Sequence, residues 1–167
     1  TDPDNAFLWR MNPRRLESQS VRDALLALGG KLDLTLGGPS LDPDKAESLP
    51  RRSLYFIQTP DTEHRFLGAF DNANVLECYR RNESVVPQQA LALTNSQLSR
   101  ATADALAEKF RADAPADFIR RAFQTILNRA PTDKEQHVSL EAFTAMKNNR
   151  PLFLQALLNH NDFVTLR

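Results

Sequence analysis

The sequence predicts a mainly α-helical protein, a compact helical bundle with a long irregular region, and it leaves open one short β ribbon. The first observation is that the second half repeats apolar residues at helical spacing, in segments bounded by proline or capping residues. The second is that 41% apolar residues, 25% charged residues and ten phenylalanines fit a folded core. At 167 residues the chain has the length of one ordinary domain. We therefore expect a single domain over residues 1–167.

The first helix is predicted to begin at Asn12 as the cap, with Pro13 at the first helical position, and to run to about Leu28. Gly29 and Gly30 are typical of a left-handed helix end. The expected apolar stripe is Val21, Ala24, Leu25 and Leu28, with Arg15, Gln19, Arg22 and Asp23 towards the other side. Before this helix, Phe7, Leu8 and Trp9 are expected to pin an aromatic cluster onto the body.

The middle of the chain predicts little regular structure. Leu32, Leu34 and Leu36 alternate as in a brief strand or anchor a loop, and residues 52–59 favour a short strand between prolines, so the two could pair as a ribbon. The acidic run DPDKAE superficially suggests calcium. Counting Asp42 as position one, an EF-hand needs an oxygen ligand at five, glycine at six and glutamate at twelve, and those positions hold Ala46, Glu47 and Ser53. We therefore expect no calcium loop there.

The second half predicts four further helices. One carries Leu98 to Phe110 and ends before Pro115, and the next runs from about Ala116 to Asn128 with the clearest apolar stripe of the chain. A T-x-x-E capping box over residues 132–135 opens the third. Pro151 starts a last short helix that runs through Leu158, closed by Asn159 and the following residues. Short links favour antiparallel neighbours.

The stretch from Phe70 to Asn95, FDNANVLECYRRNESVVPQQALALTN, holds the single cysteine and an arginine pair just before a predicted helix that has Pro87 in its first turn. A lone cysteine forms no internal disulfide, and we expect Cys78 to be buried and inert. We expect Arg80 and Arg81 to clamp coil onto the helix start, because a guanidinium fork bridges carbonyls and carboxylates. Asp71 and Glu83 are nearby acceptors. The candidate ligand-binding residues are Asp71, Arg80, Arg81 and Gln88.

The spacing FD......C.RR..S..P.QAL.L.N resembles a planctomycete-type domain of unknown function. Further blocks agree in order and spacing: DPDN...WR at residues 2–10, RRLE and VRDALLALGGKLDLTLGGPS at 14–40, RRSLY at 51–55, NRAPTDKE at 128–135 and LLNHNDF at 157–163. The usual glutamate of the last block is Asp162 here. The resemblance implies the C-terminal module of a large exported protein, periplasmic or at the cell surface, that often also carries a c-type cytochrome domain. It implies no known activity.

Searching for chemistry yields no complete signature. His64, His137 and His160 lie far apart, and no CxxC, CxxCH, Walker, G-x-S-x-G or dinucleotide motif is present. We therefore expect no metal site and no cofactor in this chain, with any haem in another domain. Four arginine pairs occur, at 14–15, 51–52, 80–81 and 120–121. If they converge they would suit anionic groups, but with 21 acidic and 21 basic residues we expect most to find carboxylates, hold coil or be solvated.

These observations leave two function hypotheses, and the resemblance alone implies a third, electron-transfer docking beside a cytochrome domain. The first is a non-catalytic scaffolding or binding module of a larger exported protein, whose partners are other domains of the same polypeptide. The alternative is part of an enzyme acting on polysaccharide, anionic or not, with a site shared with an upstream domain. The equal numbers of acids and bases argue against a nucleic-acid partner, and no apolar run is long enough to span a membrane. The start, TDPDN, lacks methionine, so we expect a piece of a longer protein.

Overall fold

The fold was analysed in a computed structural model, which describes residues 5–12, 14–59, 65–70 and 86–166. The helices are α1 (Ser18–Leu28), α2 (Arg65–Gly68), α3 (Val86–Asn95), α4 (Gln97–Lys109), α5 (Pro115–Ile126), α6 (Asp133–Ala145) and α7 (Arg150–Leu158). The described residues also form three 3-10 turns, η1 (Pro43–Lys45), η2 (Ser53–Tyr55) and η3 (Asn161–Phe163). They form two strands, β1 (Arg14–Arg15) and β2 (Thr165–Leu166). The structure is 57% helical, which confirms a mainly α fold with one short two-stranded sheet.

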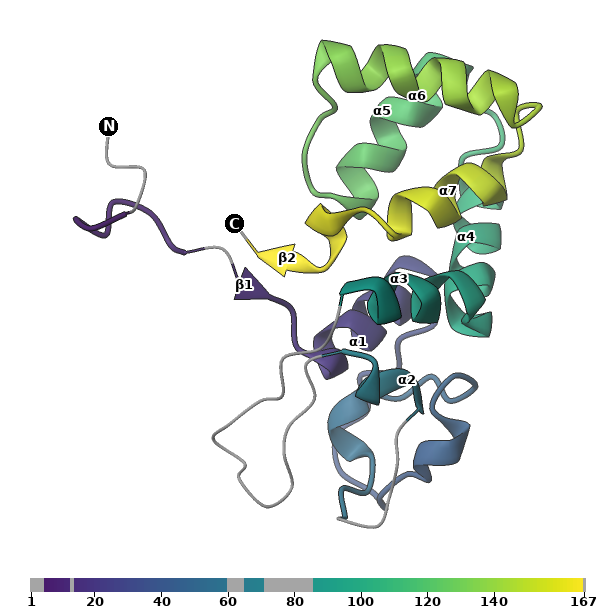
Figure 1. The fold of residues 1–167 in the computed structure, drawn as a ribbon. Coiled ribbons are helices and arrows are strands. Elements are labelled where there is room, and N and C mark those ends of the chain that lie inside the picture. The colour runs from purple at the N-terminus through teal and green to yellow at the C-terminus, as the bar shows by residue number, and fades with distance from the viewer. Residues whose placement is uncertain (1–4, 13, 60–64, 71–85, 167) are drawn as a thin grey trace.

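Helix α4 packs against α1, α3 and α7, while α5 packs on α6 and α7 (Figure 1). Each of these helices buries one face. Four phenylalanine rings pack together in the core: Phe118 of α5, Phe143 of α6, Phe153 of α7, and Phe110, which follows the end of α4. The Phe118 centroid lies 5.0 Å from that of Phe143 and 5.6 Å from that of Phe153. Tilted and edge-on rings at such distances add favourable contacts to the area that they bury.

The local signals that predicted the helix ends are confirmed. Thr132 and Glu135 form the reciprocal capping box that begins α6. Pro87 lies in the first turn of α3, and α7 begins at Arg150 and ends before Asn159. Helix α1 ends at Leu28, and Gly30 follows with φ of 68°, the left-handed conformation that glycine adopts without a steric cost.

The predicted start of the first helix is wrong. Arg14 and Arg15 form β1 and pair antiparallel with Thr165 and Leu166 at the other end of the chain, and α1 begins only at Ser18. An asparagine followed by proline is a local signal for a helix start. The pairing that competes with it joins segments far apart in sequence, and no local pattern shows such a pairing.

The ribbon expected between Leu32–Leu36 and residues 52–59 is also not formed. The segment after Arg52 makes the 3-10 turn Ser53–Tyr55, and the isolated parallel bridges nearby, Asp33 with Arg51 and Leu41 with Phe56, do not join the two predicted segments. Leu34 and Leu36 are exposed and do not anchor the loop. The acidic DPDK run is a cap, because the Asp42 carboxylate accepts the Asp44 amide of η1 at 3.0 Å.

The N-terminal lead-in leaves its apolar side chains largely exposed, contrary to expectation. Residues 5–12 extend away from the helices as an arm that precedes β1 (Figure 1). Phe7, Leu8 and Trp9 are 86%, 78% and 65% exposed. The aromatic cluster predicted for the body is therefore presented to solvent.

Candidate functional site

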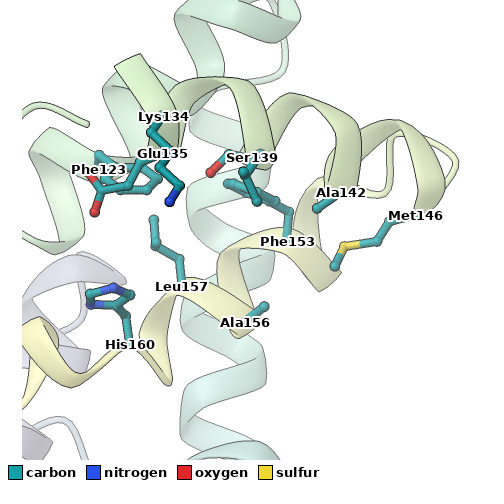
Figure 2. A pocket seen from close by; sticks show the side chains of 11 residues that line it. Phe123, Lys134, Glu135, Ser139, Ala142, Met146, Phe153, Ala156, Leu157 and His160 are labelled. Atoms are coloured by element: carbon teal, nitrogen blue, oxygen red, sulfur yellow. The ribbon is translucent and has the colours of Figure 1, made fainter. Parts of the chain in front are cut away.

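An apolar groove runs between α5, α6 and α7, with a volume of about 410 Å³ (Figure 2). Its apolar lining comes from Phe123 of α5, from Val138 and Ala142 of α6, and from Ala156 and Leu157 of α7. Met146 follows the end of α6 and lies at one end of the groove, and His160 lies at the other side (Figure 2). Small-molecule sites in proteins are mostly apolar cavities of roughly 300–1,000 Å³ with a few polar groups, and this groove has that form.

A network of three charged groups holds one end of the groove. The Arg129 guanidinium donates to both carboxylate oxygens of Glu135, at 2.7 and 2.9 Å, and to Asp162 at 2.9 Å. Glu135 also accepts the Thr132 amide at 2.7 Å, as the second half of the capping box. Hydrogen bonds from Arg129, supported by the Thr132 amide, lower the pKa of Glu135 to about 2. The charge of Glu135 is therefore already engaged within the protein.

His160 joins the same network through the backbone. Its Nδ1 accepts the Asp162 amide at 3.1 Å, so it caps η3, and Asp162 Oδ2 lies 3.7 Å from that nitrogen. An accepting Nδ1 places the ring proton of the neutral imidazole on Nε2. The partners of His160 thus have a structural role, fixing the turn after α7 beside the groove.

A second feature is a buried arginine that sequence reasoning had placed on the polar face of α1. Arg22 is 0% exposed. Its Nε donates to the Ala46 carbonyl at 2.6 Å, its Nη1 to the Arg51 carbonyl at 2.8 Å and to Ser53 Oγ at 3.1 Å, and its Nη2 to the Leu49 carbonyl. One side chain of α1 therefore binds three carbonyls of the irregular region 31–59.

Neighbouring side chains extend this clamp. Asp23 accepts the Ser53 amide at 2.8 Å and lies 3.6 Å from Arg52, and the Arg22 guanidinium lies 4.7 Å from the ring centre of Phe56. On the other side, Glu47 accepts the Leu98 amide at the start of α4 at 3.2 Å. Burial lowers the pKa of Arg22 to about 10, so the clamp remains charged at neutral pH. The clamp is structural, since its guanidinium does not reach solvent.

The third feature is the loop of residues 5–12. Asn5 is 3% exposed, and its side-chain amide donates to the Arg10 carbonyl at 2.7 Å and to Asn12 Oδ1 at 2.9 Å. Its carbonyl oxygens accept from Leu8 and Arg10. Leu8 adopts φ of 52°, which is uncommon for a residue with a branched side chain. A closed polar turn thus holds the three exposed apolar side chains of Phe7, Leu8 and Trp9 at its tip.

Of the four residues predicted as a ligand site, the structure describes only Gln88. Asp71, Arg80 and Arg81 lie outside the described residues, as do Cys78 and His64. Gln88 lies on α3 and is exposed, next to the buried Gln89. The clamp expected at Arg80 and Arg81 therefore stays a prediction, while a clamp of the same chemistry exists at Arg22.

The described arginine pairs at 51–52 and 120–121 each have partners of their own. Arg121 contacts Asp113 and Arg120 contacts Asp117, both at 3.0 Å. Arg51 donates to the carbonyls of Thr35 and Gly37, with its guanidinium 4.0 Å from the ring centre of Tyr55. These contacts agree with the prediction that such arginines find carboxylates or hold coil.

The described residues contain no group of three or more His, Cys, Asp or Glu side chains that could hold a metal ion. None of the helices in the described ranges is both long and apolar enough to cross a membrane. What the structure offers instead is an apolar groove, an apolar loop tip and an internally satisfied charge network.

The fold and these surfaces define a small, mainly helical domain with an apolar groove and an exposed apolar loop tip. The chain belongs to the PSD1 family, described as a protein of unknown function (DUF1553), whose model matches residues 1–143. No curated protein and no solved structure matches the chain. The match confirms the resemblance to a domain of unknown function. Helix α7 and β2 lie beyond the matched residues, yet Phe153 and Leu154 of α7 belong to the same core.

Proposed function

We propose that the chain is a non-catalytic scaffolding or binding module of a larger exported protein, and that residues 5–12 contact other domains of the same polypeptide. The observation that carries this proposal is the exposure of Phe7, Leu8 and Trp9, between 65% and 86%, at the tip of a closed turn. Buried polar contacts at Asn5 hold that turn. Conformational strain at an exposed apolar tip is typical of a binding element rather than of a folding core.

The energetics support a contact through this tip. Burying a large apolar side chain is worth roughly 1.5–3 kcal/mol, so the three together give roughly 5–9 kcal/mol before the costs of association. Within one polypeptide those costs are reduced, because the effective concentration of a tethered partner is high. The turn is also preorganised by Asn5, which lowers the entropy lost on docking.

The test compares two triple variants in the isolated chain and in the longer polypeptide. The first is Phe7→Ser, Leu8→Ser and Trp9→Ser. The matched control replaces three other exposed leucines, Leu34→Ser, Leu36→Ser and Leu54→Ser, which are 64%, 82% and 55% exposed. Calorimetry follows the unfolding of this domain in each context.

Contact with another domain stabilises the folded state of this domain. It should therefore melt several degrees higher in the longer polypeptide than alone. The tip variant should abolish this increment while leaving the isolated chain unchanged, and the control variant should retain it. Equal melting of the wild-type domain in both contexts, or an increment that survives the tip variant, would overturn the proposal.

A further inference from the structure

The floor of the groove between α5, α6 and α7 is packed into the core. Phe123 and Phe153 at its back are 3% and 6% exposed, and Phe153 packs with its ring centre 5.6 Å from those of Phe118 and Phe143. The capping box at Thr132 and the Arg129 network fix the start of α6 beside it. A ligand that enters the groove therefore meets an apolar floor that needs no rearrangement.

Val138 of α6 marks the open side, because it remains 52% exposed although it lines an apolar cavity. Ala142 of α6 and Ala156 of α7 both line the groove (Figure 2). Their small side chains leave open space between the two helices. An apolar chain that is laid along this space would cover Val138, Ala142 and Met146. Each buried methylene contributes favourable free energy to such a contact.

Charge distinguishes one end of the groove from the other. Lys134 lines the groove and directs its ammonium over the apolar floor near Leu157 (Figure 2). Glu135, the adjacent carboxylate, is bound by Arg129 through both oxygens. Among the described residues, no ion pair joins Lys134 to an acidic side chain, whereas Arg120, Arg121 and Arg129 all have one. The groove therefore combines an apolar floor with a cation that an anion can approach.

We propose that this groove binds a small amphiphilic carboxylate, with its apolar chain between Ala142 and Ala156 and its carboxylate paired with Lys134. The volume of about 410 Å³ lies in the lower part of the usual range for ligand sites, so a medium-length chain fits better than a full lipid. This binding site is independent of the loop of residues 5–12.

The test uses octanoate as the probe and 1-octanol as its uncharged counterpart, titrated into the whole chain by calorimetry. Octanoate should bind at one site, about fivefold more tightly than octanol. This preference corresponds to the upper end of the free energies measured for exposed ion pairs. Lys134→Gln should remove that preference and leave octanol binding unchanged. Lys109→Gln, which alters an exposed lysine in the last turn of α4, should behave as the wild type.

A second variant tests the apolar part. Ala156→Leu places a larger side chain into the groove at an exposed helical position, so it should weaken octanoate and octanol alike by about tenfold or more while the melting temperature stays unchanged. Methyl resonances of Val138, Ala142 and Met146 should shift on titration of the wild type.

Three results would overturn the proposal. The first is the absence of octanoate binding at millimolar concentrations. The second is an equal loss of octanoate affinity in Lys134→Gln and Lys109→Gln, which would show a nonspecific charge effect. The third is a dimer in analytical ultracentrifugation that Ala156→Leu dissociates, which would assign the groove to a second copy of the chain.

Discussion

Replacing Arg22 by methionine tests the clamp that joins α1 to the irregular region. Methionine keeps much of the apolar stem and the helical propensity of arginine but has no donors. The carbonyls of Ala46, Leu49 and Arg51 lose their guanidinium donor, as does Ser53 Oγ. Arg22 is 0% exposed, so water does not take its place without local opening.

The expected loss of stability follows from the burial of these partners. A buried polar group left unsatisfied costs about 1–3 kcal/mol, and the Arg51 and Leu49 carbonyls are only partly buried, so opening to water reduces their share. Folding of the wild type has to desolvate the guanidinium, and folding of the variant does not. This difference offsets part of the loss of stability. We expect a net loss of about 3 kcal/mol, near the lower end of values for a broken buried charge contact. In a domain of this size that lowers the melting temperature by about 6–12 °C.

The assay is thermal and urea unfolding followed by circular dichroism, with limited proteolysis of residues 31–59 as a local readout. Arg120→Met is the matched control, because Arg120 is 57% exposed and forms an ion pair with Asp117 on the same helix. The unfolding free energy of Arg120→Met should stay within about 0.5 kcal/mol of the wild type. If Arg22→Met melted within about 2 °C of the wild type and was cleaved no faster in region 31–59, the clamp would carry no stability and the reasoning would fail.

Two further predictions concern the helical body. The pKa of Glu135 is lowered from 4.5 to about 2, so its contribution is present above pH 4.5 and is lost as the pH falls towards 2. Glu135→Gln should therefore cost about 1 kcal/mol at pH 7 after solvent screening and nothing near pH 2, as urea titrations at both pH values can show. Gln also suits this position of a capping box, so a loss that persists at low pH would contradict the ionic explanation. Phe118→Ala should cost about 3–5 kcal/mol because the side chain is fully buried among three rings. Val138→Ala, at a site 52% exposed, should stay within about 0.5 kcal/mol in the same urea unfolding; equal losses in the two variants would contradict the assigned core.

Local chemistry predicted those parts of the fold that local interactions determine. The T-x-x-E box at Thr132, the proline in the first turn of α3 and the glycines after Leu28 were all sufficient to place a helix boundary. The helical spacing of Ile119, Ala122, Phe123, Ile126 and Leu127 correctly identified most of the buried face of α5, which also includes Phe118. These signals act within a few residues, which is why a single sequence shows them.

Arg22 shows where the same reasoning failed. The buried face of α1 is Ser18, Val21, Arg22, Leu25 and Leu26, which follows helical spacing well. Assigning the stripe by apolar residues alone shifted it towards Ala24 and Leu28 and placed Arg22 with the solvent. Helical spacing alone places Arg22 on the buried face between Val21 and Leu25. The prediction missed it because it did not consider a buried arginine with backbone carbonyls as its partners.

The candidate sites were harder to predict because they depend on contacts between distant segments. The groove takes its lining from three helices, and each of its residues looks like ordinary helix surface or core in the sequence. Phe7, Leu8 and Trp9 are exposed on an arm that precedes β1, and β1 pairs with β2 from the other end of the chain. The resemblance of the sequence blocks led to the family, and the family leaves the activity open.

Hydrogen–deuterium exchange of residues 5–12 is the most direct measurement of the proposed role of this module. The loop should exchange much more slowly in the longer polypeptide than in the isolated chain, and this added protection should be lost when Phe7, Leu8 and Trp9 are replaced by serine. Equally fast exchange of the loop in both contexts would contradict the account.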